Sequence, residues 1–595
     1  MLTTSEQIVY TNEAKCRDCY KCVRVCPVNA IRMSGGQASV VNERCIMCGT
    51  CIRNCPQNAK TYRRDIHKVR EFLDGGYTTA VSIAPSFPAL FNEWEIKRIP
   101  SLLRKLGFRY VYETAVGAFY SAWFSATELQ SKDKRNLVCS ACPSFVNYVR
   151  KYHPSLTDQL SGVDSPMIAH AKIIRSTVGS DVKTIFIGPC IAKKGEAGEP
   201  GNKGLVDAVL TFDELLELTE EKGISIDTLE ESCFDSVPAG ASRLYPVSGG
   251  FFRTAGIDYS GLKDSVTAVS GYEEVSELIR MLKEEKGVIA EALFCQTGCT
   301  NGPGLKSDID LHSRKRRVIR YAAAGAESTG NEYDPMPYTD GSISFARKIT
   351  PSPVTEKQFT EEQVREVLEH TGRINDSDRL DCGACGYSSC YEKALAVLRG
   401  MAEKEMCLPY MKKMAEQRSD KIIESTPNAI VILNYKLEII KINPAFRRFF
   451  VCGNSSIGKP ISLIIDPEHF IRLRESREEK TEIQQEHPKY GLVCHQLIYK
   501  LKEENQIVGI FVDVTKNLTD TRKLDDLRRQ TIIQARELLN HQIEMAQKMA
   551  QFLGENTARG EILVENLIQL TADPAKSVND KSAKNWLWDT GTSKR

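Results

Sequence analysis

The cysteines that decide the fold stand in three short stretches: Cys139-Ser-Ala-Cys142-Pro143, Gly188-Pro-Cys190-Ile-Ala-Lys-Lys194 and Glu291-Ala-Leu-Phe-Cys295-Gln-Thr-Gly-Cys299-Thr-Asn-Gly302. Each stretch follows an apolar run typical of a strand. Because the carboxyl ends of parallel strands meet at one edge of a sheet, we expect Cys142, Cys190, Cys295 and Cys299 to lie together. Four gathered thiolates are the ligand set of a 4Fe–4S cluster. The residues alone therefore predict an iron–sulfur cluster buried between two lobes.

Strand-like and helix-like segments alternate around these stretches, from about residue 66 to residue 348. Segments 79–83 and 184–187 have the apolar composition of buried strands, and segments 96–106 and 145–152 have the spacing of amphipathic helices. A helix over 214–222 is expected to begin after a capping Thr or Asp in Thr211-Phe-Asp-Glu214. The alternation predicts an α/β architecture with a mostly parallel sheet.

The three cysteine stretches resemble the three signature motifs of the iron-only (FeFe) hydrogenases, whose core domain would span residues 66–348. The family motifs read roughly Thr-Ser-Cys-Cys-Pro, Met-Pro-Cys-x-x-Lys-Lys and Glu-x-Met-x-Cys-x-x-Gly-Cys-x-x-Gly-Gly-Gly. The resemblance implies that Cys142, Cys190, Cys295 and Cys299 hold the cubane of the H-cluster. It also implies that Cys299 bridges to a diiron subsite carrying carbon monoxide, cyanide and a dithiolate.

Two further positions match the family's groups around the diiron subsite. Lys193 matches the lysine that hydrogen-bonds a cyanide, and an ammonium beside an anion in a closed site makes a strong charge-assisted contact. Ala84-Pro85-Ser86 matches the family's turn over the subsite. The resemblance therefore implies that Pro85 and Ser86 line the pocket.

The sequence departs from the family in its proton-transfer residues. Ala141 stands where the family has a proton-donating cysteine, and Trp123-Phe-Ser-Ala-Thr-Glu128 aligns with a relay stretch that has a further glutamate in place of Ser125. Glu128 remains, and Ser161 matches a relay serine. Proton delivery needs a titratable group within hydrogen-bond reach, so we expect slow hydrogen turnover. Cys139 is expected to be a buried strand cysteine rather than a substitute donor.

Residues 1–65 contain one cysteine pattern twice, Cys-x2-Cys-x2-Cys-x3-Cys-Pro. This is the run of two-cluster bacterial ferredoxins, in which the fourth cysteine of each run ligates the other cluster. One 4Fe–4S cluster is therefore assigned to Cys16, Cys19, Cys22 and Cys55, and a second to Cys45, Cys48, Cys51 and Cys26. Structural zinc, the alternative, favours paired Cys-x2-Cys units that are well separated in sequence.

A third cysteine block lies in residues 355–415, after a proline-containing linker at 349–353. Its spacing is x2, x4 and x16, and its residues are Cys382, Cys385, Cys390 and Cys407. Glycines in the block allow the backbone to approach a cluster and donate N–H bonds to its sulfurs. The block resembles the small 4Fe–4S domain of several anaerobic redox proteins, with zinc as the alternative.

The carboxyl-terminal third changes character. Residues 417–520 resemble a PAS domain, an α+β fold, on the stretches Ser425-Thr-Pro-Asn-Ala-Ile430, Asn443-Pro-Ala-Phe446 and Gly509-Ile-Phe-Val-Asp-Val514. Within residues 521–572, residues 524–553 are expected to form one long helix, in which apolar residues recur every three or four positions from 532 to 553 with one polar position at Gln542. This spacing predicts a signalling helix that dimerises as a coiled coil, or a helix packed on its own domain. Residues 573–595 are expected to be a flexible tail.

Composition bounds the classes of function. The 595 residues carry 79 Lys+Arg against 77 Asp+Glu, which argues against a strongly basic nucleic-acid binder. No apolar stretch approaches the ~20 residues of a membrane helix, and no secretory signal is recognised. A cytoplasmic protein is therefore expected, in which the 20 cysteines serve as metal ligands rather than disulfides.

The whole arrangement is similar to the sensory, PAS-containing branch of the FeFe-hydrogenases. Its expected cofactors are two ferredoxin-type 4Fe–4S clusters, the H-cluster and one further 4Fe–4S cluster. Its expected partners are dihydrogen, a redox partner such as ferredoxin, a separate kinase or phosphatase, and a second copy joined through the final helix. Two alternatives stay open: an active ferredoxin-linked hydrogenase, and a non-enzymatic iron–sulfur sensor without the diiron subsite.

Overall fold

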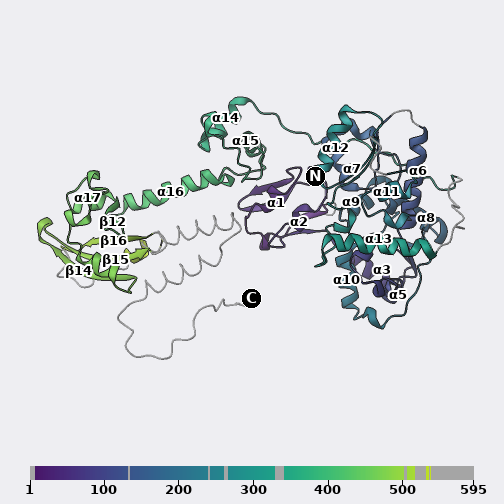
Figure 1. The fold of residues 1–595 in the computed structure, drawn as a ribbon, viewed down its shortest axis with the longest axis horizontal. Helices are drawn as coiled ribbons and strands as arrows, with labels where there is room; N and C mark the ends of the chain where they lie inside the picture. The colour runs from purple at the N-terminus through teal and green to yellow at the C-terminus, as the bar shows by residue number, and fades with distance from the viewer. Residues whose placement is uncertain are drawn as a thin grey trace. The chain divides into compact units, whose positions relative to one another are not determined.

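The chain folds into two units, Met1–Met406 and Cys407–Arg595, in this computed structural model. The structure describes residues 7–131, 135–236, 238, 241–259, 265–328, 341–501, 505–515, 531–534 and 537. The first unit contains all three cysteine blocks except Cys407, which is the first residue of the second unit. The second unit contains the region that resembles a PAS domain (Figure 1). Each unit is described separately.

The amino-terminal region has the internal symmetry that its repeated cysteine pattern predicts. Strands β1 (Val9–Thr11) and β4 (Lys60–Tyr62) pair antiparallel, and so do β2 (Ile31–Ser34) and β3 (Gln37–Val40). Between the strands stand two short helices, α1 (Lys21–Arg24) and α2 (Thr50–Arg53). Each helix carries the third cysteine of its run, so the two halves present their thiols in the same way. We call residues 16–26 the first half and residues 45–55 the second half.

Two parallel sheets form the core that follows. The first has the order β6-β5-β8-β9, and the second has the order β10-β11-β7. Their bounds are Thr79–Ile83 for β5, Tyr110–Glu113 for β6, Leu137–Val138 for β7, Lys183–Gly188 for β8, Ala208–Thr211 for β9, Val266–Ser270 for β10 and Ile289–Leu293 for β11. Strand β5 is completely buried at the centre of the first sheet, and its polar Ser82 is hydrogen-bonded there to Thr114 and His170.

Helices connect and cover these strands. They include α5 (Ile99–Leu106), α6 (Ala115–Ser131), α7 (Pro143–Tyr152), α8 (Pro166–Val178), α10 (Phe212–Glu221), α12 (Tyr272–Glu284) and α13 (Leu311–Ser328). Helices α6 and α8 lie side by side (Figure 1). Helix α10 begins two residues before the expected start, because Thr211 caps it in a reciprocal capping box with Glu214. The expected α/β architecture with parallel sheets is confirmed.

The last part of the first unit carries the third cysteine block. Helix α14 (Glu361–His370) packs on α15 (Cys390–Leu398) through a small apolar cluster that includes Val364, Leu368 and Ala394. The cysteine loop lies between these helices in sequence. In the second unit, helix α16 (Leu408–Ser425) runs without a break across the domain boundary that we expected at residues 415–417.

The second unit contains a five-stranded antiparallel sheet with the order β13-β12-β16-β15-β14. Its strands are β12 (Ala429–Asn434), β13 (Ile439–Ile442), β14 (Lys480–His487), β15 (Leu492–Leu501) and β16 (Gln506–Asp513). Helices α17 (Pro444–Phe449) and α18 (Glu468–Glu475) pack their aromatic residues Phe446 and Phe470 into the same core. The sheet and helices form the α+β domain that the sequence predicts.

Two expectations concern the end of the chain and membranes. The predicted helix over 524–553 lies outside the described residues except at 531–534 and 537, so its dimerisation stays a prediction. Among the described segments, no helix combines the length and the apolar character needed to cross a bilayer.

Candidate metal centre

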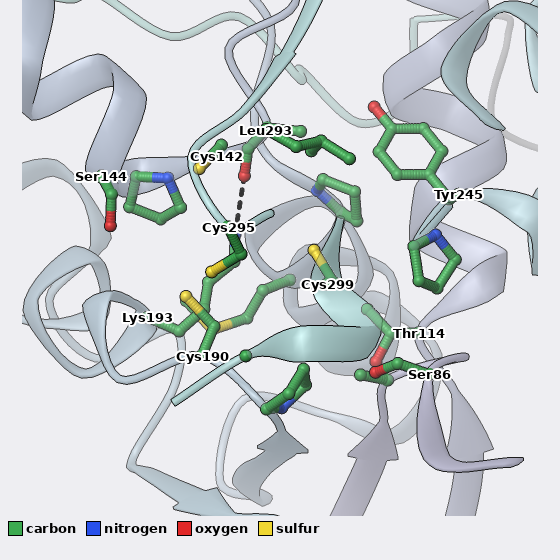
Figure 2. A pocket seen from close by; sticks show the side chains of 18 of the residues that line it. Ser86, Thr114, Cys142, Ser144, Cys190, Lys193, Tyr245, Leu293, Cys295 and Cys299 are labelled. Carbon is green, nitrogen blue, oxygen red and sulfur yellow. Dashed lines mark hydrogen bonds between the residues drawn. The ribbon is translucent and has the colours of Figure 1, made fainter. Parts of the chain in front are cut away.

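The four cysteines of the core come from the carboxyl ends of both sheets. Cys190 follows β8 of the first sheet, whereas Cys142 and Cys295 follow β7 and β11 of the second. Cys142 is also the residue before α7, so the helix amino terminus begins at a predicted ligand. Figure 2 shows the sulfurs of Cys142, Cys190, Cys295 and Cys299 turned toward one space. The topology therefore gathers thiols that are more than 150 residues apart in sequence.

Burial controls the protonation of these thiols. Burial, reinforced by the charge of Cys142, raises the pKa of the Cys190 thiol to about 11. Burial likewise raises the pKa of the Cys299 thiol well above its ordinary value, and the neighbouring thiols of Cys295, Cys142 and Cys190 add to that effect. Metal binding requires thiolates, so loading this site releases protons and becomes more favourable at higher pH.

The spacing of the thiols also bears on what the site can hold. Within the described ranges, no three His, Cys, Asp or Glu side chains converge tightly enough to hold a single metal ion. A cubane is wider than one ion, because each thiolate binds a different iron at a corner of the cube. Four thiols gathered from separate strands are the ligand set of such a cube.

A cavity of about 90 Å³ lies beside Cys299, and its walls are almost entirely apolar. Residues of both sheets and of α6 line it, including Pro85, Ser86, Ala118, Ala141, Lys193, Tyr245 and Leu293. Pro85 and Ser86 line it together with the thiols of Cys142, Cys190, Cys295 and Cys299. The pocket is therefore the space that a cluster on these thiols would occupy, and it extends to the residues that the resemblance assigns to a diiron group.

Ser86 provides a test of what the pocket fits. Its side chain is fully buried, and its hydroxyl has no hydrogen-bond partner among the described residues. Ser86 and Thr114 both line the pocket (Figure 2). A buried unpaired hydroxyl costs about 1–3 kcal/mol, which a bound hydrogen-bond acceptor would recover. The pocket therefore fits a compact group that is apolar overall and carries hydrogen-bond acceptors.

Lys193 also faces the pocket, but its ammonium is already engaged. It donates to Glu196 Oε2 at 2.6 Å, to Ser165 Oγ at 2.9 Å and to the Ala141 carbonyl at 3.2 Å. An ammonium has three N–H donors. A cyanide at this lysine would have to replace one of these acceptors, and the Ala141 carbonyl is the most distant of them.

Sequence reasoning missed Glu196, which holds Lys193 in place. The Glu196 carboxylate is buried and also accepts hydrogen bonds from Ser165 at 3.0 Å and from Arg347 at 3.1 Å. Its position three residues after Lys193 on helix α9 (Ala192–Ala197) was the available signal, because residues three apart share a helix face.

The predicted relay residues form a hydrogen-bonded chain. Ser161 Oγ donates to Glu128 Oε2 at 3.0 Å, and it lies 2.9 Å from Ser125 Oγ. Both serines are buried, whereas Glu128 is partly exposed. These hydrogen bonds therefore lead from the surface into the core. Ala141, which lines the pocket, has no polar side-chain group that could extend them to the pocket.

Cys139 and Glu291 are buried polar groups near the site that have other roles. Cys139 is buried, as expected, and its Sγ lies 3.4 Å from Tyr245 Oη. Glu291 accepts hydrogen bonds from the backbone N–H groups of Gly249 and Phe251, the latter at 2.8 Å. Burial raises the pKa of Glu291 to about 7. Glu291 thereby positions the turn that carries Tyr245 at the pocket wall.

The ferredoxin-like cysteines gather in the crossed sets that the spacing predicts. Burial raises the pKa of Cys22 to about 11, and the nearby thiols of Cys19, Cys16 and Cys55 add to the shift. The corresponding neighbours of Cys51 are Cys45, Cys48 and Cys26. Cys26 Sγ and Cys55 Sγ each accept an N–H bond at 3.2 Å, from Ala30 and Ala59 respectively. Each set contains one thiol from the opposite half.

The second half packs directly on the core site. A Cβ added at Gly49 would lie 2.5 Å from Pro303 Cβ, and Arg53 Nη1 donates to the Asn301 carbonyl at 2.7 Å. Cys48 itself lines the pocket wall near Cys295. A cluster in the second half would therefore neighbour a cluster in the core.

The remaining cysteines are more exposed or lie elsewhere. Cys382 is exposed, and Cys385 and Cys390 are half-buried. Cys407 is the first residue of the second unit and precedes α16. In the second unit, Cys494 is buried in the core of the sheet and Cys452 packs against that core, as plain apolar residues do.

Four family models match the chain. They describe the C-terminal domain of the iron-only hydrogenase large subunit (residues 77–303), a 4Fe–4S dicluster domain (8–56), an Fe–S cluster domain (378–409) and a PAS domain (417–484). All four cysteines of the third block lie within the third match. The order of the matches is the order of domains expected from the sequence.

Curated relatives of two kinds match the core. Iron hydrogenase 1 of Clostridium pasteurianum is 27% identical over 279 residues, covering 38% of this chain and 49% of that protein. Cytosolic iron–sulfur assembly component 3 of Pongo abelii is 26% identical over 286 residues, covering 37% of this chain and 59% of that protein. The match thus spans about half of each relative. An apo FeFe-hydrogenase structure from Chlamydomonas reinhardtii aligns with 49% of this chain and all of its own, at 16% identity and a TM-score of 0.38.

Proposed function

We propose that this chain, whose residues 77–303 are homologous to the iron-only hydrogenases, senses dihydrogen at a diiron subsite beside Cys299. In this proposal, electrons pass through the 4Fe–4S clusters of the first unit. The PAS domain and the helix that follows it convert the redox state into a signal for a separate kinase or phosphatase.

The pocket beside Cys299 carries the proposal. It is apolar, it adjoins four gathered thiols, and it contains the unpaired hydroxyl of Ser86 and the ammonium of Lys193. When bound there, a diiron group would supply the iron chemistry that splits or forms dihydrogen. The apolar walls exclude water, which strengthens each hydrogen bond from the protein to such a group. Glu196 and Ser165 hold Lys193 at the edge of this space.

The proton-handling residues favour a sensor over a fast enzyme. Glu128, Ser161 and Ser125 form a hydrogen-bonded chain, but Ala141 has no titratable group at the pocket. Proton transfer by a positioned side chain contributes about 10²–10⁴-fold to a rate. A site without that group would turn over slowly, so it could report hydrogen while consuming little of it.

A second candidate is an iron–sulfur protein that never receives the diiron group. Homology to proteins named cytosolic iron–sulfur assembly component 3 favours it, and so does the saturation of Lys193 by three protein acceptors. The buried Ser86 hydroxyl favours the first candidate, because an unpaired hydroxyl has no purpose beside a permanently empty pocket.

Infrared spectroscopy of anaerobically matured protein separates the two candidates. We expect stretching bands of iron-bound carbon monoxide and cyanide, and we expect hydrogen to shift them. Protein produced without maturation enzymes is the control, and it should lack the bands. Absence of the bands from correctly loaded protein, with all 4Fe–4S clusters present, would refute the diiron proposal.

Restoring the missing thiol tests the sensor interpretation. We expect Ala141→Cys to raise hydrogen evolution by about 10²-fold or more, because the new thiol can deliver protons at the pocket. Ala118→Cys is the matched control, since Ala118 lines the same pocket on α6. If Ala141→Cys evolves hydrogen no faster than the unmodified protein, the missing thiol does not limit turnover.

A further inference from the structure

The cysteine loop of the third block lies directly on the first half of the ferredoxin-like region. A Cβ added at Gly386 would lie 3.0 Å from both the Arg24 backbone nitrogen and Val23 Cγ1. Arg24 Nη1 makes a long hydrogen bond of 3.5 Å to the Ala384 carbonyl. Ala384 and Gly386 flank Cys385, and Val23 and Arg24 follow Cys22 on α1. A predicted ligand on each side is thus next to the contact.

Further contacts hold this part of the chain in place. The Met33 N–H donates to the Met401 carbonyl at 2.9 Å, and the Gly35 N–H donates to Glu403 Oε1 at 2.6 Å. Glu356 forms ion pairs with Arg44 at 2.8 Å and with Arg399 at 2.7 Å, so it links the two regions. The contact at Gly386 therefore belongs to a docked interface that combines backbone and charged contacts.

The interface repeats a contact made elsewhere in the molecule. Arg53 has the position in the second half that Arg24 has in the first, and it donates to a carbonyl in the core loop after Cys299. In both places an arginine of the short helix reaches a carbonyl of another cysteine-bearing loop. In both places a glycine allows the close approach: Gly49 lies against the Pro303 side chain of the core, and Gly386 lies against the backbone of α1.

The residues of the third block fit an iron–sulfur cluster. Cys382, Cys385 and Cys390 provide three thiols within nine residues, and the loop turns at Gly383 and Gly386 with positive φ of 67° and 91°. Such turns aim successive backbone N–H groups at bound sulfur. Tyr387 closes the loop toward the ferredoxin-like region with only 4% of its surface exposed, which keeps water out of the contact.

We propose that the third-block cluster exchanges electrons with the ferredoxin-like clusters across the contact between Gly386 and α1. One electron leaves a reduced 4Fe–4S cluster of the ferredoxin-like region and enters an oxidised cluster in the third block. No bond is broken and no proton is needed. The first half thus serves the third block as the second half serves the core. The inference rests on the third cluster of the proposed function and not on the diiron group.

Electron paramagnetic resonance of the full chain reduced with dithionite tests the contact. Reduced clusters in contact relax each other's spins, so we expect the ferredoxin-like signal to be broadened and hard to saturate. In Gly386→Leu, the bulky side chain separates the loop from α1, and the same signal should narrow and saturate at lower microwave power. The iron content should stay at the level of the unmodified protein.

Gly400→Leu is the matched control. Gly400 lies in the same part of the chain and has the same left-handed backbone, with φ of 68° against 91° at Gly386, but no atom lies within 4 Å of its added Cβ. It should show the unmodified signal. A Gly386→Leu protein with full iron content and an unmodified signal would overturn the proposal.

A measurement on the unmodified protein covers the case in which Gly386→Leu fails to hold its iron. During stepwise reduction, the saturation of the ferredoxin-like signal should change as the third cluster takes up its electron. No change at that step would also overturn the proposal. Neither experiment uses hydrogen, so missing carbon monoxide and cyanide bands would refute the proposed function and leave this result intact.

Discussion

The two halves of the ferredoxin-like region share one local structure but face different neighbours. Asn29 and Asn58 occupy equivalent positions with nearly equal positive φ of 46° and 48°. The first half faces the loop of the third block, and the second half faces the core pocket. A duplicated module can therefore connect two unlike redox sites, because each copy of its short helix offers the same arginine and cysteine.

The difference between the halves lies in which partner provides the glycine. In the second half, Gly49 follows Cys48, and the absence of a side chain there allows Pro303 of the core to pack against it. The first half has Tyr20 at that position, and Tyr20 is buried. Its neighbour provides Gly386 instead. Two cysteine-bearing loops can approach this closely only where one of them has a glycine. At the core contact the ferredoxin-like region provides it, and at the other contact the third block provides it.

The largest expected effect comes from the crossed cysteines. Cys26→Ser should damage the cluster of the second half, next to the core, and Cys55→Ser should damage that of the first half, because each thiol lies with the opposite set. Iron analysis and electron paramagnetic resonance should show one altered cluster in each variant. Cys452→Ser, in the second unit, should change neither. If Cys26→Ser altered the first-half cluster, the crossed assignment would be wrong.

The second-largest effect is expected from substituting two glycines of the ferredoxin-like region, Gly49 and Gly35. Gly49→Ala and Gly35→Ala both place a side chain at positive φ, which costs about 1–2 kcal/mol in each case. Gly49→Ala also collides with Pro303, whereas nothing lies near an added Cβ at Gly35. The collision should cost a further 1–3 kcal/mol, roughly. The measurement is the urea midpoint for loss of cluster absorbance, and equal midpoints in the two variants would contradict the close contact.

The smallest effect compares the equivalent arginines. Arg53→Gln removes a hydrogen bond of 2.7 Å to the core, whereas Arg24→Gln removes one of 3.5 Å to the third block and one of 3.2 Å to the Cys19 carbonyl in its own half. A charged hydrogen bond of good length contributes about 1 kcal/mol or more, and a long one contributes less. Because both bonds of Arg24 are longer than that of Arg53, the same urea experiment should rank Arg53→Gln as at least as destabilising as Arg24→Gln. The reverse order would show that the contact between the first half and the third block contributes more to stability than the contact between the second half and the core.

Local patterns in the sequence predicted much of the fold and of the candidate site. The largely apolar stretch of β5, the cap at Thr211 and the positions of the predicted ligands all follow from neighbouring residues and spacing. The pocket position of Pro85 and Ser86 came instead from a resemblance to a family. These features have short-range causes or a recognisable motif.

Other features depend on contacts that spacing does not encode. Strand β14 is largely polar, so its sequence lacks the alternation that marks a half-buried strand. The engagement of Lys193 by Ser165 joins segments that only the folded core brings together. The docking of Gly386 on α1 joins residues more than 350 positions apart, and a lone glycine carries no sign of its partner.

Helix α16 has a mechanical consequence for the second unit. Its carboxyl-terminal end is tied to the sheet domain by Asn443, whose amide donates to the carbonyls of Ile423 and Asn428 at 3.0 and 2.8 Å. Its other end begins at Cys407. Eighteen helical residues make a rod about 27 Å long, so a pivot of about 10° at the sheet would swing Cys407 by about 5 Å. A displacement of about 5 Å at that thiol would thus accompany a rotation of only about 10° at the sheet end of the helix.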